Sequence, residues 1–272
     1  MHNTHISFIG RAASYSPNSV EKDRAILVAV WERLSAQGYS CAGIIGEEED
    51  WQSEAADAYV SMGRRPAVVD ALLAQSRPVV NEPCGVRQCR NRQELMAALE
   101  RQGVPVPPKT GQDGYWVKRG DDYATTPLDV QFAADDAAVR RLCDDMRQRG
   151  VCFVDVRAHV VGDLVKFYGV RGTSFFRCYY PGDDGNWKFG DEQHNGRPHH
   201  YPFAISSLHS MMDRAAALTS LDIYGGDCIV RPDGSFVLID LNDWPSFSRC
   251  REEAAEAIAD RIRQRISKSG KL

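Results

Sequence analysis

The stretch Gly226-Asp227-Cys228-Ile229-Val230, followed by Pro232-Asp233-Gly234 and Val237-Leu238-Ile239-Asp240-Leu241-Asn242, decides the fold. Strong turn residues stand between two apolar runs, so this stretch predicts a β-hairpin. Alternate residues of a strand share a face, which puts Asp240 and Asn242 on one side, with Asp227 near that end of the partner strand. Two carboxylates and an amide are oxygen ligands of the kind that Mg²⁺ prefers. The pattern predicts a metal site, although polar residues that only cap a hairpin would look the same.

This hairpin resembles the metal-binding hairpin of the ATP-grasp superfamily. In that family an acidic residue on one strand precedes an acid-x-Asn on the next, and Asp227, Asp240 and Asn242 match those three ligands. The likeness is closest over residues 218–247, and the order of the lobes extends it to nearly the whole chain. It implies a mixed α/β and α+β ATP-grasp fold with an N-terminal Rossmann-like (pre-ATP-grasp) lobe, and ATP and Mg²⁺ as cofactors.

The order of predicted elements agrees with three lobes. Residues 1–85 alternate strands and helices, which predicts a parallel sheet with helices on its faces. Residues 86–155 are expected to form the small ATP-grasp lobe, closed by a buried strand at 151–154. Residues 156–272 are expected to form the C-terminal lobe with the metal site, and they begin with a long strand at 158–170.

Lys118 ends a short predicted strand, and the resemblance implies that its ammonium reaches the α- and β-phosphates. The loop that follows, residues 119–126, would cover the phosphates with backbone N–H groups and with the hydroxyls of Thr125 and Thr126. Arg92 stands where family members carry a lysine or arginine that assists. The alternative for each basic side chain is an ordinary solvated position on the surface.

The segment Cys152-Phe153-Val154-Asp155-Val156 follows a predicted helix end and lies between two lobes. The resemblance implies that it is the hinge that binds adenine, largely through backbone groups. Phe153, Val154 and Asp155 are therefore candidate nucleotide contacts, and Asp163 is a candidate for the ribose hydroxyls. Both acids could equally be solvated loop residues.

A second set of candidates concerns the acceptor. Lys166 lies inside an otherwise apolar strand, where an ammonium costs desolvation energy unless it meets an anion, so we expect it to contact phosphate. Arg171 and Arg177 would extend a cationic floor for a small anionic substrate. His159 lies where inositol phosphate kinases often place a histidine that faces the substrate. The alternative for the three cations is an exposed sheet face on which they snorkel.

Three functions agree with these residues: a kinase, a ligase, and an ATP-binding module without catalysis. Lys166-Phe167-Tyr168-Gly169-Val170 looks like the Lys-x-Tyr-x-Val strand of inositol phosphate and inositol pyrophosphate kinases. Gly225 stands where many carboxylate–amine ligases carry an arginine for the tetrahedral intermediate. We therefore favour transfer of the γ-phosphoryl group of ATP to a small anionic substrate. The alternatives are a carboxylate–amine ligase of the ribosomal-protein-modifying type, acting through an acyl phosphate, and an ATP-binding module without catalysis.

The composition limits the kinds of binding partner and the cellular compartment that we expect. Lys and Arg total 33 against 37 for Asp and Glu, which argues against a general nucleic-acid or membrane binder. Eight cysteines without a recognisable secretion signal suggest a reducing compartment, and we expect a cytoplasmic protein. The histidines of His194–His200 match no recurring zinc spacing. The oligomeric state is not predicted.

Overall fold

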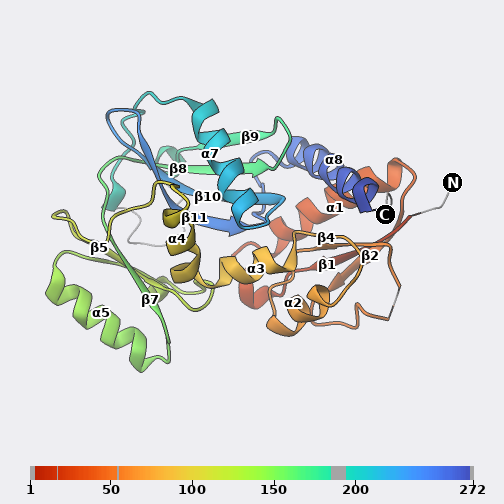
Figure 1. The fold of residues 1–272 in the computed structure, drawn as a ribbon, viewed down its shortest axis with the longest axis horizontal. Helices are drawn as coiled ribbons and strands as arrows, with labels where there is room; N and C mark the ends of the chain where they lie inside the picture. Colours follow the sequence, from red (N-terminus) through yellow and green to blue (C-terminus); the bar gives the residue numbers. More distant parts are fainter. Residues whose placement is uncertain (1–3, 17, 54, 185–193, 270–272) are drawn as a thin grey trace.

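The computed structural model describes residues 4–16, 18–53, 55–184 and 194–269. Three sheets follow one another along the described chain. In Figure 1 the N-terminal sheet lies at the right, the three-stranded sheet at the lower left, and the C-terminal sheet above and between them. None of the described helices is long and apolar enough to cross a membrane.

The N-terminal sheet is parallel, with the strand order β2-β1-β3-β4. Its elements are β1 (His5–Gly10), α1 (Val20–Ala36), β2 (Ser40–Gly46), β3 (Ala58–Ser61), α2 (Pro66–Leu73) and β4 (Val79–Val80). Ile6 and Phe8 of β1 are fully buried against Ile26 and Val30 of α1. The alternation of strands and helices in the sequence therefore gives the predicted parallel sheet.

The three-stranded sheet is antiparallel, with the order β6-β5-β7, and α5 covers one face. Its elements are β5 (Tyr115–Arg119), β6 (Val130–Ala133), α5 (Asp136–Gln148) and β7 (Val154–Ala158). The carboxylate of Asp135 caps α5 by accepting the Ala138 N–H at 2.7 Å. The strand predicted at 151–154 is wrong, because Val151 is buried beneath α5 without being part of a strand. The true strand also crosses the lobe boundary expected after residue 155.

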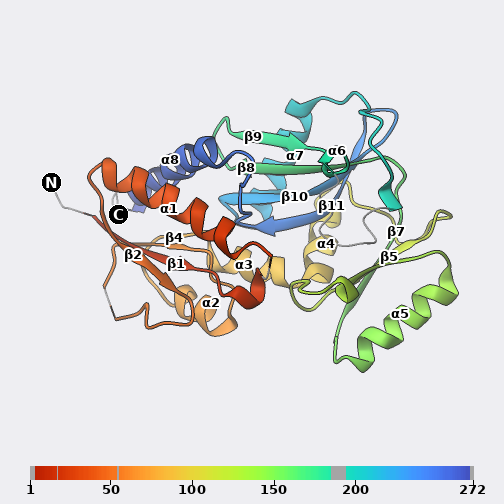
Figure 2. The same cartoon turned by 180° about the vertical axis from the view of Figure 1, so that it is seen from behind.

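The C-terminal sheet is antiparallel, with the order β11-β10-β8-β9. Its elements are β8 (Asp163–Val170), β9 (Phe176–Tyr179), α7 (Ile205–Leu218), β10 (Ile223–Val230) and β11 (Phe236–Asp243). Helix α7 covers the face that is nearer in Figure 1 and packs Leu208 and Met212 against the sheet. Figure 2 shows β10 and β11 on the nearer side when the molecule is turned around. The strand predicted at 158–170 is in fact the end of β7, a turn, and β8.

The remaining elements join the sheets. Helices α3 (Pro83–Arg90) and α4 (Arg92–Arg101) connect the N-terminal sheet to the three-stranded one, and α3 was not predicted. Helix α8 (Arg251–Ser269) lies beside α1 in both views, although the two are at opposite ends of the chain (Figures 1 and 2). Short elements are η1 (Ala13–Tyr15), η2 (Pro127–Asp129) and α6 (Pro181–Asp184). The two ends of the chain are thereby joined in one core.

Candidate active site

Three side chains form a row across the C-terminal sheet. Lys166 of β8 is opposite Asp227 of β10, and Asp227 is opposite Asp240 of β11. Opposite residues of antiparallel strands point to one face, so the row follows directly from the register. The Lys166 Nζ lies 2.9 Å from the Asp227 Oδ1, and the amide nitrogen of Asn242 lies 3.1 Å from the Asp240 Oδ2. The structure thus brings together the three oxygen-bearing side chains that the hairpin pattern singled out.

The hairpin carries a bulge beside this row. Asp240 pairs with Asp227, whereas Cys228 pairs with the residue two positions before Asp240, which leaves Ile239 without a partner on β10. Bulges of this kind re-aim groups next to functional sites. Gly226 allows the close approach of the strands here, because a Cβ atom on it would lie 2.1 Å from the Asp240 carbonyl oxygen. The hairpin predicted from the sequence begins at Asp227, whereas β10 begins four residues earlier, at Ile223, and includes Gly225 and Gly226.

Two cations from the other side face the bulge. Arg92, at the start of α4, places Nη2 2.9 Å from the Asp240 Oδ1 and donates from Nη1 to the Ile239 carbonyl oxygen at 3.3 Å. The Lys118 Nζ donates to the same carbonyl at 3.4 Å. Burial lowers the pKa of Lys118, and the positive charge of Arg92 adds to this effect, because both disfavour an ammonium. An anion bound between Lys118 and Arg92 would offset both the burial of the ammonium and its repulsion from the guanidinium.

The row and the cations line one cavity of about 730 Å³, a size typical of ligand sites. Its lining includes Arg92, Lys118, Lys166, Asp227, Asp240 and Asn242. A smaller cavity of about 20 Å³ lies alongside and shares Trp116, Lys118, Asn195 and Ile239 with it. Its other walls include Met96, Asp155, Val160 and Ile229. Within the described ranges no group of three or more His, Cys, Asp or Glu is arranged to hold a metal ion, so two carboxylates and an amide are what this site offers one.

The loop expected to cover phosphates is held by an internal acid. The backbone N–H groups of Thr125 and Thr126 donate to the Asp129 Oδ2 at 3.1 and 3.0 Å. The Thr126 hydroxyl lies 3.1 Å from the same oxygen. Thr125 lines the large cavity and Thr126 does not. The donors that the resemblance assigned to phosphate are thus bound to Asp129 in this structure.

The expected hinge is only partly at the cavities. Asp155 lines the smaller one, where its Oδ1 lies 3.3 Å from the Arg157 Nε. Val154 begins β7, and the Phe153 carbonyl accepts the Gly120 N–H at 2.7 Å, so that carbonyl is engaged within the lobe. The Phe153 side chain is 52% exposed. Only Asp155 of the three therefore borders a cavity.

Asp163 does not face either cavity. Its buried carboxylate accepts the backbone N–H groups of His199 and Tyr201 at 2.7 and 2.9 Å. These bonds tie the start of β8 to the chain that leads into α7. The ribose role expected for Asp163 has no support from this placement, because both oxygens are engaged. Residues 185–193, which precede the histidines of His194–His200, lie outside the described residues.

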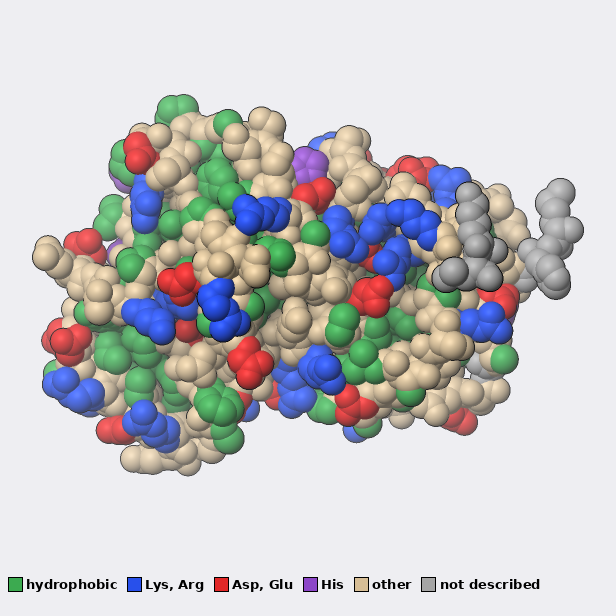
Figure 3. Space-filling view, in the orientation of Figure 1, with side chains coloured by type: hydrophobic (Ala, Val, Ile, Leu, Met, Phe, Trp, Pro, Cys, Tyr) green, Lys and Arg blue, Asp and Glu red, His purple; other side chains and the backbone are tan. Residues whose placement is uncertain are grey.

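The expected floor of Arg171 and Arg177 is not formed. Arg171 follows the end of β8, and its Nη2 lies 2.6 Å from an oxygen of the buried Asp222, which also pairs with Arg261. Figure 3 shows Lys and Arg side chains gathered over this part of the molecule, near α8. Arg177 pairs with Glu253 at the surface, where its side chain is 44% exposed. Neither arginine lines the large cavity.

His159 is also placed away from the large cavity. The Trp116 indole N–H donates to its Nδ1 at 3.1 Å, so this nitrogen must carry a lone pair. Burial lowers the pKa of His159, which favours the neutral ring that this bond requires. The neighbouring Phe132 ring packs edge-on at 5.7 Å. His159 is therefore a packed residue of the small lobe in this structure.

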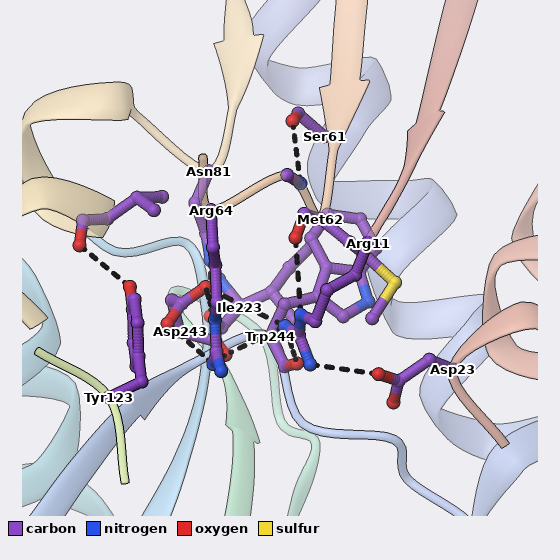
Figure 4. Close-up of polar contacts among 12 residues, drawn as sticks. Arg11, Asp23, Ser61, Met62, Arg64, Asn81, Tyr123, Ile223, Asp243 and Trp244 are labelled. Carbon is purple, nitrogen blue, oxygen red and sulfur yellow. Dashed lines mark hydrogen bonds and ion pairs between the residues drawn. The ribbon is translucent and has the colours of Figure 1, made fainter. Parts of the chain in front are cut away.

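Sequence reasoning missed a second charged group at the cavity, drawn in Figure 4. Arg64 follows β3 and binds Asp243 through two hydrogen bonds, from Nε at 3.1 Å and from Nη2 at 2.8 Å. Arg11 follows β1 and donates to Asp23 at 3.0 Å and to the Trp244 carbonyl at 2.8 Å. Both arginines line the cavity. A signal existed, because both stand after parallel strands, at the edge where α/β sheets bind ligands.

The comparisons with known proteins bear on the fold. No family model matches the sequence, and no curated protein matches it. A RimK domain ATP-grasp protein from Sphaerobacter thermophilus is similar in structure, with a TM-score of 0.64 and 14% identity, over 95% of this chain and 99% of that one. The D-alanine–D-alanine ligase from Coxiella burnetii has a TM-score of 0.70 and 12% identity, over 100% of this chain and 96% of that one.

A third similar structure is the D-alanine–D-alanine ligase from Bacillus anthracis complexed with ATP. It has a TM-score of 0.66 and 10% identity, over 100% of this chain and 98% of that one. Identities this low speak to the fold alone. The coverage is nearly complete in both directions, so the likeness of fold extends over all three sheets. This chain has the ATP-grasp fold.

Proposed function

We propose that this chain binds ATP with Mg²⁺ in the large cavity and transfers the γ-phosphoryl group to a small anionic substrate. One observation carries the proposal: oxygen ligands on the C-terminal sheet face cations from the small lobe within one cavity. Phosphoryl transfer depends mainly on positioning and charge neutralisation, which such a site supplies without a strong base. A similar fold complexed with ATP supports the choice of nucleotide.

The residues present fit a magnesium ion. Asp227, Asp240 and Asn242 offer hard oxygen ligands from adjacent strands, and Mg²⁺ commonly takes only one or two carboxylates beside the phosphates of its nucleotide. The side chains of Asp227 and Asp240 are 17% and 20% exposed, so they are open to the cavity. A bound ion would neutralise charge on the phosphate oxygens. These three residues are the ones we expect to hold it.

The chain's own cations would orient the nucleotide. Lys118 and Arg92 share the Ile239 carbonyl as a partner, and both would turn from it to phosphate oxygens at little cost. The smaller cavity beside them has apolar walls from Met96, Val160 and Ile229, which are of the kind that packs against a base, but its 20 Å³ is about the volume of one water, so these walls would have to move apart to admit a base. Lys166 comes from the opposite sheet and would reach the γ-phosphoryl group. The nucleotide would therefore lie between the two sheets.

The rest of the cavity suits an anionic acceptor. Beyond the phosphate cations, its lining includes Lys22 and Arg249, and two buried ion pairs in which Arg11 faces Asp23 and Arg64 faces Asp243. Hydroxyl groups also line this half, from Tyr15, Ser16, Ser246 and Ser248. Positive charge among hydroxyls favours a small acid over a neutral molecule. This half is formed by the N-terminal sheet and by the chain after β11.

A carboxylate–amine ligase is the second candidate, because the similar structures include two D-alanine–D-alanine ligases. Its first step is the same transfer, with a carboxylate as acceptor. One feature weighs against it. A side chain at Gly225 would meet Pro245 at 2.7 Å and Tyr168 at 3.0 Å, so the arginine that many ligases carry there has no room. The kinase reading therefore stands first, with the ligase reading close behind.

The test uses the full chain with ATP, Mg²⁺ and a panel of small acids that includes amino acids, dicarboxylates and phosphorylated polyols. A stable phosphorylated product with one ADP for each product supports the kinase. A hydroxamate formed with added hydroxylamine reveals an acyl phosphate and supports the ligase.

Binding of an ATP analogue without turnover of any acid would support a module that has lost catalysis. Failure to bind the analogue in the presence of Mg²⁺ would refute the proposal. Asp240→Ala should abolish turnover, and Asp233→Ala is the matched control, because Asp233 lies in the exposed turn of the same hairpin.

A further inference from the structure

Tyr123 lies in the loop between β5 and β6 and is buried, with 8% of its surface exposed. The Arg64 Cζ stands 3.9 Å from the centre of its ring. Its hydroxyl donates to the Val86 carbonyl of α3 at 3.0 Å. Figure 4 shows the ring beside the Arg64 side chain. A residue from the β5–β6 loop is thus inserted between Arg64 of the N-terminal part and the connecting helix α3.

The same loop has two further contacts, one with α3 and one with the N-terminal part. Asp122 accepts two hydrogen bonds from Arg90 of α3, at 3.0 and 3.1 Å. The ring of Tyr15 meets the Tyr123 ring edge-on, with centres 5.9 Å apart. Tyr15 and Asp122 both line the large cavity. The loop is therefore docked at a position that helps to form the cavity wall.

Arg64 links this docking to the proposed metal site. Its guanidinium binds Asp243 through two nitrogens, and Asp243 directly follows Asn242 on β11. A paired guanidinium has a fixed plane, which presents one face for stacking. Cation–π contacts of this kind are stronger when they are buried. One arginine therefore contacts both the loop and the end of the strand that carries the oxygen ligands.

We propose that Tyr123 is a positioning residue, which holds the β5–β6 loop against Arg64 and thereby sets the loop over the nucleotide phosphates. The inference rests on the proposed function, because it assigns this loop a place at the nucleotide. Tyr123 acts through the position of the loop that follows Lys118, and it does not touch the reacting atoms. The stacking face of the ring, rather than its hydroxyl, carries the role.

The test compares Tyr123→Met with Tyr123→Phe in the full chain. Methionine fills much of the buried volume without an aromatic face, whereas phenylalanine keeps the face and loses only the bond to Val86. For Tyr123→Met, amide hydrogen exchange in residues 120–126 should become about tenfold faster, and the Kd for a non-hydrolysable ATP analogue should rise about tenfold. Tyr123→Phe should stay within about threefold of the wild type on both measures.

Two comparisons separate positioning from general destabilisation. The amides of β10 should exchange as in the wild type, because the loop opens locally and the sheet does not. Tyr59→Met is the matched control, because Tyr59 is a buried tyrosine packed against Trp51 in the N-terminal part, away from the loop. This control should leave loop exchange and analogue affinity unchanged. Once a phosphoryl acceptor has been identified, turnover assays should show that Tyr123→Met raises KM for ATP more than it lowers kcat.

Each failure has a separate meaning. Unchanged loop exchange in Tyr123→Met overturns the inference, and so does a Tyr123→Phe variant that behaves like Tyr123→Met. Equal acceleration in the loop and in β10 would also overturn it, because the ring would then only support the fold. A wild-type chain that binds no nucleotide would refute the proposed function, while loop exchange would still report on the Tyr123 contact.

Discussion

Two charged groups meet at the large cavity, and they are built differently. The row of Lys166, Asp227 and Asp240 lies on three neighbouring strands, and its side chains are 23%, 17% and 20% exposed. The pair of Arg64 and Asp243 joins residues 179 positions apart, with side chains 9% and 2% exposed. The first group is positioned by the register of the sheet, and its side chains are partly exposed to the cavity. The second is positioned by hydrogen bonds between distant parts of the chain, and its side chains are buried.

The difference indicates what each group is for. An open ion pair on a rigid sheet can exchange its partner for a ligand at small cost. A buried pair with two hydrogen bonds cannot, because separating it would leave charges without compensation in a medium of low polarity. We therefore expect the row to control catalysis and the buried pair to control stability. The following predictions test that division, from the largest effect to the smallest.

Asp240→Asn should lower kcat by about 10³-fold or more, since a bound metal ion supplies several kcal/mol of charge stabilisation. The melting temperature should change by less than about 3 °C, because Asp240 is partly exposed and the replacement has the same shape. Turnover assays and thermal unfolding of the same preparation check both. Wild-type turnover would remove Asp240 from the site.

Asp243→Asn should mainly lower the stability of the fold, whereas Asp240→Asn mainly lowers kcat. Removing this carboxylate leaves Arg64 buried without its partner, which costs about 3–5 kcal/mol of unfolding free energy. Denaturant titration measures that loss. Asp233→Asn is the control, because Asp233 is an exposed turn residue. A stable Asp243→Asn protein with no turnover would break the proposed division between the two groups.

Lys118 should give a pH signature. Its pKa is lowered, so it loses its proton at a lower pH than an ordinary lysine. Phosphate binding favours the ammonium, so nucleotide affinity should be highest below that lowered pKa and should fall about tenfold as the pH rises through it. The groups that face Lys118 are Arg92, Asp155, Asp227 and Asp240.

Lys118→Arg supplies the control for that pH dependence. The guanidinium does not titrate in this range, so the variant should bind the ATP analogue with little dependence on alkaline pH. Calorimetry of analogue binding across the pH range measures both proteins. An equal fall in affinity for both would assign the titration to another group.

Arg177→Gln should leave both stability and turnover almost unchanged. Its partner Glu253 is 57% exposed, and exposed ion pairs contribute about 0–1 kcal/mol. We expect a melting temperature within about 2 °C of the wild type and kcat within about twofold. A large loss of turnover would return Arg177 to the acceptor site, where the sequence had suggested it.

The sequence predicts the row well because its signals are local. The turn at Pro232-Asp233-Gly234 and the period of two along β11 suffice to put Asp240 and Asn242 on one face. The place of Arg64 after a parallel strand indicates that it borders a ligand site, but its partners carry no local signal, because they come from parts of the chain that meet only in the folded protein. The strand predicted at 151–154 is wrong for a related reason, which Val151 illustrates. Its apolar character reports burial, and burial under α5 looks the same in a sequence as burial in a strand.

The expected roles of Arg171 and Asp163 show a second limit. Strand alternation gives the face of a residue only while the strand continues, and β8 ends at Val170, just before Arg171. Asp163 stands at the first residue of β8, where backbone N–H groups from a distant segment reach its carboxylate. Ends of strands are therefore where sequence-based assignments to a ligand are weakest.

The ion pairs of the row have a consequence for the order in which ligands bind. Arg92 occupies one oxygen of Asp240, and Lys166 occupies one oxygen of Asp227. A metal ion alone must compete with these cations, and a nucleotide alone must compete with these acids. When both arrive together, each partner released by one ligand is taken up by the other, so neither the acids nor the cations of the site are left unpaired. We therefore expect metal and nucleotide to strengthen each other's binding by the same factor, as linkage requires.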